Sequence, residues 1–214
     1  MKKRFKMIAF DLDGTLVDSM GGFADIAENV IHKHFKVSIP TARLYYKTTS
    51  GLPFRFQLQK LFPGHEAIDR AEEEYESVKT AEYAVRPFFS DVASALQKLK
   101  NAGFLLSVSS NNSEENVRQK MSGHAAVFDE IVGFRPGFFK GTDHFCHLAE
   151  KYGIAQSEIL FVGDSLHDAK MAHDNGISFV ARLGTFSDEE FRALDMTMNS
   201  ISDLTELCGL LEVC

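Results

Sequence analysis

The sequence predicts an α/β fold, in which a parallel β-sheet carries an inserted helical module. Short and continuously apolar runs, which are typical of strands buried on both faces, occur at five places in the chain. Helical patterns separate these runs, and this alternation indicates β-α-β units with a parallel sheet. The stretch from residue 19 to residue 87 breaks the alternation, because it contains helical patterns and no buried-strand run.

The predicted elements follow the chain in a regular order. The strands are expected at residues 7–10, 104–109, 130–133, 159–162 and 178–181. Between them we expect helices at residues 91–100, 143–152 and 168–175, with Ser90 as the N-cap of the first. Ser113 is a candidate N-cap for a further helix. The interrupting stretch should form helices at residues 23–35, 41–47, 54–61 and 68–83, and the acidic run in the last one is interpreted as a solvated face.

The composition is that of an ordinary soluble protein. The chain has 214 residues and a formal net charge of −7, with 44% hydrophobic and 25% charged residues, which argues against disorder. The excess of acids argues against nucleic acid and anionic membranes as partners, because clustered Lys and Arg bind both. Three cysteines without CxxC spacing suit a reducing compartment, and no apolar run approaches the ~20 residues of a membrane span. We therefore expect a soluble, cytoplasmic protein, which still allows a small charged ligand in a pocket.

The chemically most informative motif follows the first predicted strand. It reads Asp11-Leu12-Asp13-Gly14-Thr15, so two carboxylates lie two residues apart where a buried strand ends. Ligands of open parallel sheets bind at this end of the strands, and Gly14 allows the chain to leave the pleat there. Two neighbouring acids repel each other, and a hard divalent ion such as Mg²⁺ would keep both ionised. A DxDG turn or a helix cap is the alternative interpretation of the same residues.

Polar residues also follow other predicted strands. Asp164 and Asp168 follow the fourth strand, although Asp168 alone could also be explained as an acid at a helix N-terminus. Ser110 and Asn111 follow the second strand, where hydroxyl, amide and backbone N–H groups would suit an anion. Lys140 precedes a predicted helix, and it gains significance only beside the other motifs, because a lone lysine is usually solvated.

Taken together, the four motifs resemble those of the haloacid dehalogenase-like (HAD) superfamily. The motifs DxDGTLxDS, starting at Asp11, and GDSxxD, starting at Gly163, are specific as a pair, while the Ser/Asn and Lys motifs are placed by their spacing. The resemblance covers the chain outside residues 19–87, where only placement and helical character match. It implies a Rossmann-like core of residues 1–18 and 88–214 and an all-helical cap of residues 19–87, as in the phosphoglycolate phosphatase-like and β-phosphoglucomutase-like branch.

The resemblance also implies a role for each motif residue. Asp11 would attack phosphorus and form an aspartyl phosphate, and Asp13 would act as the general acid and then as the general base. The carboxylates of Asp11 and Asp164 and the backbone carbonyl of Asp13 would hold Mg²⁺, with Asp168 orienting its water shell. Ser110 and Asn111, with the backbone beside them, would bind the phosphoryl oxygens, and Lys140 would neutralise charge on Asp11 and on the phosphate. One departure is Gly141 after this lysine, where many relatives have proline.

The function expected from this resemblance is Mg²⁺-dependent hydrolysis of a small phosphorylated metabolite, such as phosphoglycolate or a sugar phosphate. The resemblance also implies phosphoester chemistry over dehalogenation, because the dehalogenases of the superfamily have no acid at the position of Asp13, which Gly14 and Thr15 follow here. The alternatives are a β-phosphoglucomutase-like phosphomutase, a phospho-acceptor signalling domain and a non-catalytic phospho-ligand-binding or regulatory protein. A monomer or a homodimer is expected.

Two other groups of residues could contribute to a site. Cations of the cap could contact an anionic tail of the substrate, and the candidates are Arg43, Lys47 and Arg55. A predicted helix carries a possible transition-metal group made of Asp143, His144, Cys146 and His147. This group lacks the second half of a zinc motif, so an ordinary helix face is the favoured interpretation.

Overall fold

The computed structural model describes residues 4–83 and 85–213 and divides the chain into two compact units. One unit comprises Met1–Val17 and Phe88–Cys214, and the other comprises Asp18–Pro87. Asp18 therefore belongs to the second unit, whereas the sequence motif would place it in the first. Within the described ranges, none of the helices has the length and apolar character needed to span a bilayer.

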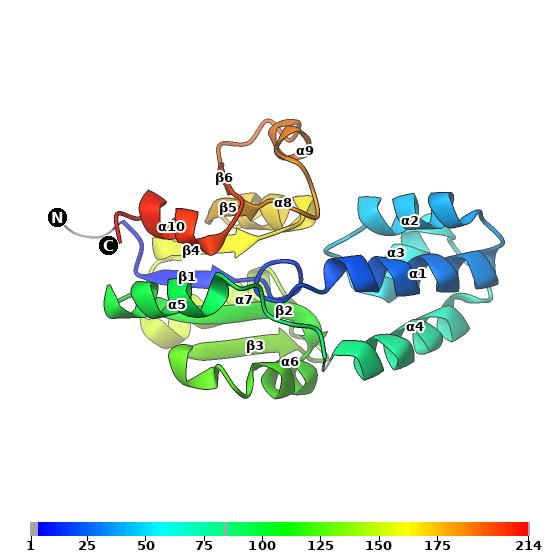
Figure 1. Ribbon diagram of the computed structural model, residues 1–214, viewed down its shortest axis with the longest axis horizontal. Coiled ribbons are helices and arrows are strands. Elements are labelled where there is room, and N and C mark those ends of the chain that lie inside the picture. The colour runs from blue at the N-terminus through cyan, green and yellow to red at the C-terminus, as the bar shows by residue number, and fades with distance from the viewer. Residues whose placement is uncertain (1–3, 84, 214) are drawn as a thin grey trace. The chain divides into compact units, whose positions relative to one another are not determined.

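The described part of the first unit is built on one sheet of six parallel strands (Figure 1). They are β1 (Met7–Phe10), β2 (Leu105–Ser113), β3 (Glu130–Phe134), β4 (Ile159–Gly163), β5 (Ser178–Arg182) and β6 (Asn199–Ile201). Their order, β3-β2-β1-β4-β5-β6, is that of a Rossmann-like sheet, in which the direction of winding reverses between β1 and β4. The predicted α/β class with a Rossmann-like parallel sheet is confirmed.

Burial explains which strands the sequence reveals. β1 and β4 lie in the middle of the sheet and are buried along their whole length, so both consist of continuous apolar runs. β6 lies at the sheet edge and reads Asn-Ser-Ile, so no apolar run marks it, and it was not predicted. β2 continues past its expected end at Ser109 to Ser113, and its register with β3 shifts between these two residues.

Helices cover the sheet on both sides. The α-helices of this unit are α5 (Val92–Asn101), α6 (Glu114–Met121), α7 (Thr142–Tyr152), α8 (Leu166–Asp174), α9 (Asp188–Arg192) and α10 (Leu204–Leu210). α7, α8 and α9 share one hydrophobic cluster with the sheet, in which Phe145, Phe161 and Phe179 are in ring contact. α5 contacts β2 and α10, and it lies in front of the sheet in Figure 1. The arrangement is the three-layer one expected of β-α-β units.

The start of α5 differs from the prediction. The helix begins at Val92, and Asp91 rather than Ser90 holds the N-cap position. The side chain of Asp91 makes no capping hydrogen bond, because its carboxylate accepts two hydrogen bonds from the Arg182 guanidinium. The assignment of Ser90 as the N-cap is therefore wrong, and a tertiary ion pair explains why local capping does not decide this helix start.

Local capping chemistry does decide two other helix starts. Ser113 accepts a hydrogen bond from the N–H of Asn116 at the start of α6, which confirms its predicted role as an N-cap. α8 begins at Leu166, earlier than expected, because Ser165 and Asp168 form a capping box around its first turn.

The described residues of the second unit form helices and no strand. The helices are α1 (Met20–Phe35), α2 (Ile39–Thr48), α3 (Phe54–Leu61) and α4 (Ile68–Tyr83). Each coincides with or overlaps a helix expected from the sequence, so the all-helical insertion is confirmed. Its core is aromatic: Phe54 stacks on Tyr75 with 3.9 Å between the ring centroids, and the hydroxyl oxygens of Tyr46 and Tyr75 lie 3.1 Å apart.

Basic and acidic side chains of the second unit pair with each other. Arg43 lies 2.7 and 2.9 Å from carboxylate oxygens of α1, and Arg55 lies 2.7 and 2.5 Å from carboxylate oxygens of α4. Glu72 is one partner of Arg55, and Glu74 pairs with Lys33 at 2.7 Å. The acidic run of α4 is therefore more than a solvated face, and the charges of both arginines are balanced within the unit.

Candidate active site

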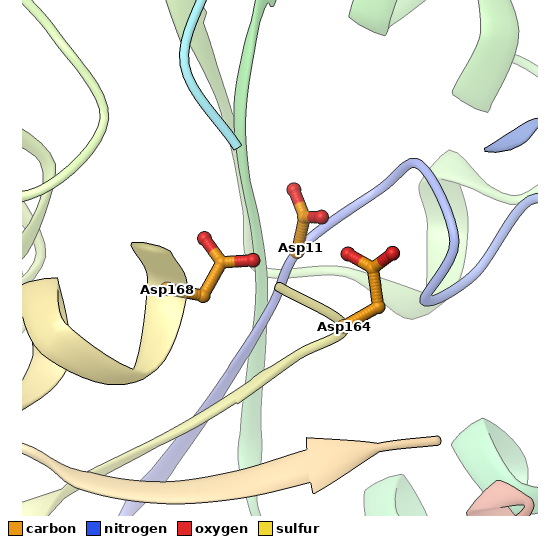
Figure 2. A group of neighbouring side chains, drawn as sticks. All are labelled: Asp11, Asp164 and Asp168. Atoms are coloured by element: carbon orange, nitrogen blue, oxygen red, sulfur yellow. The ribbon is translucent and has the colours of Figure 1, made fainter. Parts of the chain in front are cut away.

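Three carboxylates from two neighbouring strand ends meet at one edge of the sheet (Figure 2). Asp11 follows β1, Asp164 follows β4, and Asp168 lies in the first turn of α8. β1 and β4 are paired in parallel, and the N–H of Asp11 donates to the carbonyl of Val162 at 2.8 Å. The three side chains offer ligand atoms within 4.8 Å of one another, and the residues are 6%, 2% and 0% exposed.

Lys140 completes this cluster from a distant part of the chain. Its Nζ lies 2.7 Å from Asp11 Oδ1 and 2.7 Å from Asp168 Oδ1, and its side chain is 3% exposed. The residue lies between β3 and α7, directly before Gly141, whose φ of 110° is in the region that favours glycine. The structure thus brings together the residues of three of the four sequence motifs.

Burial dominates the electrostatics of the cluster. It raises the pKa of Asp11 from 3.8 to about 7, against the opposing effect of the Lys140 ammonium. Burial also raises the pKa of Asp164 well above 3.8, and the charge of Asp11 adds to this effect. Burial disfavours the charged form of Lys140, but Asp11 and Asp168 outweigh it and raise the pKa of that amine. Keeping all three buried acids ionised therefore requires more positive charge than the ammonium of Lys140 supplies.

A divalent cation fits this donor set. Three ionised carboxylates and one ammonium leave a net charge of −2, which a divalent ion would balance. All the candidate ligand atoms are carboxylate oxygens, the donor type that Mg²⁺ prefers. A bound cation would also favour the ionised form of each acid.

Asp13 lies beside the cluster in a tight turn after β1. Gly14 has a φ of 76°, and its N–H donates to the carbonyl of Val17 at 2.8 Å, which turns the chain back. The carboxylate of Asp13 is half-buried, and its Oδ2 accepts a hydrogen bond from Asn112 Nδ2 at 2.5 Å. The acid that the motif predicts is therefore held in a defined orientation by a side chain from β2.

The Ser/Asn motif lies where β2 becomes irregular. Ser110 is buried, and its Oγ accepts a hydrogen bond from the N–H of Asn112 at 3.1 Å. Asn111 is half-buried in the same stretch, between the two. Asn112, which contacts Asp13, was not predicted; its only sequence signal is that it extends the polar run from Ser109 to Ser113.

Asp168 both caps the start of its own helix and belongs to the acidic cluster. Its Oδ2 accepts hydrogen bonds from the Ser165 N–H at 3.3 Å and from Ser165 Oγ at 2.7 Å, as in a helix capping box. Its Oδ1 faces Lys140 in the acidic cluster.

Asp164 has a partner that the sequence did not predict. Thr185 Oγ1 donates a hydrogen bond to Asp164 Oδ2.

The possible transition-metal group on α7 does not form a site in the described residues. His144 is buried, and its Nδ1 forms a hydrogen bond of 2.9 Å with Ser109 Oγ. Cys146 accepts a hydrogen bond from Gln156. Among the described residues, the group that could hold a metal is Asp11, Asp164 and Asp168.

Comparison with known proteins identifies the family. The family model described as haloacid dehalogenase-like hydrolase matches residues 8–182. The phosphoglycolate phosphatase of Mannheimia succiniciproducens is 29% identical over 206 residues, covering 84% of this chain and 86% of that protein. A haloacid dehalogenase-like hydrolase of Streptococcus pneumoniae superimposes with a TM-score of 0.80 at 20% identity, covering 97% of this chain and 98% of the other. A predicted phosphatase of Clostridium acetobutylicum gives 0.80 at 23% identity, covering 97% and 99%. The family model covers most of the chain and residues of three of the four motifs form one cluster, so this protein belongs to the haloacid dehalogenase-like hydrolase family.

Proposed function

We propose that this protein is a Mg²⁺-dependent phosphatase that hydrolyses a small phosphorylated metabolite through an aspartyl phosphate on Asp11. The observation that carries the proposal is the position of Asp11, a buried carboxylate paired with Lys140 at 2.7 Å and clustered with Asp164 and Asp168. The match to phosphoglycolate phosphatases along most of the chain supports the reaction class.

In the first step, an Oδ atom of Asp11 attacks phosphorus and the bond to the leaving oxygen breaks. Asp13 gives its proton to that oxygen, so the product leaves as an alcohol. Asn112 holds Asp13 Oδ2, which fixes the orientation of the acid for this transfer. The ammonium of Lys140 balances charge on Asp11 and on the phosphoryl oxygens, and Ser110 and Asn111 bind those oxygens.

In the second step, water attacks phosphorus while Asp13 accepts its proton. The bond between phosphorus and Asp11 breaks, and inorganic phosphate is released. Asp13 is therefore returned to its protonated form, ready for another cycle.

Mg²⁺ would be held by the carboxylates of Asp11 and Asp164 and by the backbone carbonyl of Asp13, with Asp168 orienting its water shell. The bound ion would supply charge stabilisation for the phosphoryl group. Lys140 and the ion together explain how a site built of acids could bind a dianionic phosphate.

Phosphoglycolate is the first substrate to test, because relatives covering most of the chain are phosphoglycolate phosphatases. Sugar phosphates are the second class. The ion pairs of Arg43 and Arg55 weaken the case that either arginine contacts the substrate, because acids of their own unit already neutralise both.

The test is phosphate release from a panel of phosphorylated metabolites and an aryl phosphate, with and without Mg²⁺. We expect turnover that requires Mg²⁺, is abolished by EDTA and is lost in Asp11→Asn. Asp13→Asn should lose most turnover. Full activity in EDTA or in Asp11→Asn would contradict the proposal, as would the absence of phosphate release from every compound.

A further inference from the structure

Thr185 contacts the acidic cluster from outside the four motifs. Its hydroxyl donates a hydrogen bond to Asp164 Oδ2. Thr185 lies in the loop after β5, and Asp164 follows β4, which is the neighbouring parallel strand with Gly163 paired to Ala181. The contact therefore links the ends of two adjacent strands at the edge where the three carboxylates meet.

The backbone around Thr185 is anchored on both sides. Before it, the N–H of Leu183 donates to the carbonyl of Ile201 in β6 at 2.8 Å, and Gly184 adopts a φ of 136°. A side chain is strained at that φ, so glycine is required for this turn. After it, Phe186 is buried in the hydrophobic cluster and packs on the ring of Phe191. The backbone that carries Thr185 is thus fixed on both sides, and this fixes the position of the threonine beside Asp164.

This contact restrains the rotation of the Asp164 carboxylate. One of its oxygens, Oδ2, accepts a hydrogen bond from Thr185, and its carboxyl group lies close to those of Asp11 and Asp168 (Figure 2). A carboxylate held in this way loses less conformational freedom when it binds a cation, and partners of ligand side chains typically change metal affinity by about 10- to 100-fold.

We propose that Thr185 is a positioning residue that orients Asp164 for the divalent cation and so sets the affinity of the site for it. The inference rests on the proposed function, because it takes Asp164 as a metal ligand. The inference adds to the site a residue from the loop between β5 and α9, where the sequence shows no motif.

The experiment measures metal binding directly, by titration calorimetry of Mg²⁺ into the full-length protein without substrate. Thr185→Val removes the hydroxyl at nearly constant volume and should raise the Kd for Mg²⁺ about tenfold or more. Thr185→Ser keeps the hydroxyl and should restore an affinity close to that of the unaltered protein. Should the valine variant fail to fold, Thr185→Ala provides the same comparison with less bulk.

A matched control is Thr205→Val, because the Thr205 hydroxyl also contacts a carboxylate, that of Asp203 at the start of α10. Its Kd for Mg²⁺ should not change. Thermal unfolding of all variants in EDTA separates loss of metal binding from loss of stability.

An unchanged Kd in Thr185→Val would overturn the inference, as would a serine variant as weak as the valine variant. Both results would leave the proposed phosphatase function intact. By contrast, failure of the unaltered protein to bind Mg²⁺ at all would overturn the metal assignment itself.

Discussion

Lys140 and Asp11 form a buried ion pair with 2.7 Å between Nζ and Oδ1, although 129 positions separate them in the chain. Asp11 ends the central strand β1, and Lys140 lies beyond β3, at the edge of the sheet. The pair forms because parallel strands place all their carboxyl ends at one side of the sheet. A single lysine thereby becomes part of the cluster that the acids form.

Replacing Lys140 by methionine should lower kcat by about 100-fold, because the phosphoryl group and Asp11 would both lose a preorganised cation. The measurement is steady-state phosphate release with the best substrate of the panel. Lys151→Met is the control, since Lys151 also pairs with an acid but is half-exposed at the end of α7. A kcat for Lys140→Met equal to that of this control would contradict the role given to Lys140.

Replacing Asn112 by leucine should lower kcat about tenfold with little change in KM, because the 2.5 Å hydrogen bond orients Asp13 and not the substrate. Asn111→Leu provides the contrast: if Asn111 binds the phosphoryl group, its loss should mainly raise KM. The two kinetic profiles should therefore differ, and equal kcat and KM in Asn112→Leu and the unaltered protein would show that the contact with Asp13 is unimportant.

The Asp91–Arg182 ion pair should stabilise the fold in a pH-dependent way. Burial alone would raise the pKa of Asp91, but hydrogen bonds from Arg182 and from the N–H of Leu204 outweigh it and hold this pKa below 3.8. A carboxyl with a lowered pKa contributes stability above its ordinary value, and this contribution is lost as the pH falls through the folded-state value. Asp91→Asn should therefore lower the free energy of unfolding at pH 7 by about 3 kcal/mol, and by less below pH 3.8.

Urea unfolding at several pH values measures this difference. Arg192→Met is the control, because it breaks an exposed pair with Asp188 and should change the free energy of unfolding by less than about 1 kcal/mol. A difference between the unaltered protein and Asp91→Asn that stays constant from pH 7 to pH 3 would rule out the proposed linkage.

His144 should stay neutral at pH 5. Burial, together with the charge of Lys140, lowers its pKa from 6.5 to about 3. The unfolded chain takes up this proton near pH 6.5, so acidification from 6.5 toward 3 favours the unfolded state. Nitrogen chemical shifts of the imidazole should show a neutral ring at pH 5, and His144→Gln should remove this part of the pH dependence. A protonation midpoint near 6.5 would contradict the burial argument.

The sequence predicts strands and helices well where burial leaves a one-dimensional pattern. β1 is found at its observed bounds, because a central strand is apolar on both faces. The start of α5 and strand β6 are missed for the opposite reason. The carboxylate of Asp91 pairs with the distant Arg182 instead of capping its own helix. Strand β6 is a short polar edge strand that forms by pairing with β5.

For the site, the motif residues identify the chemistry but not all the contacts. Asp11, Asp164 and Asp168 could be singled out because acids follow predicted strands at defined spacings. Lys140 could be placed only by its spacing from the other motifs, and the structure brings these four residues together. Asn112 and Thr185 could not be singled out from the sequence, because each matters only through its hydrogen bond to an acid of the site, Asp13 or Asp164.

The sequence by itself therefore determined the α/β class, the helical insertion and the acids that suit a divalent cation, since apolar periodicity and motif spacing are properties of the chain. Only the tertiary structure decided which groups orient those acids, such as Asn112 for Asp13 and Thr185 for Asp164. Hydrogen bonds and ion pairs depend on distances of about 3 Å between atoms that the fold brings together from distant positions, and no local pattern encodes such distances.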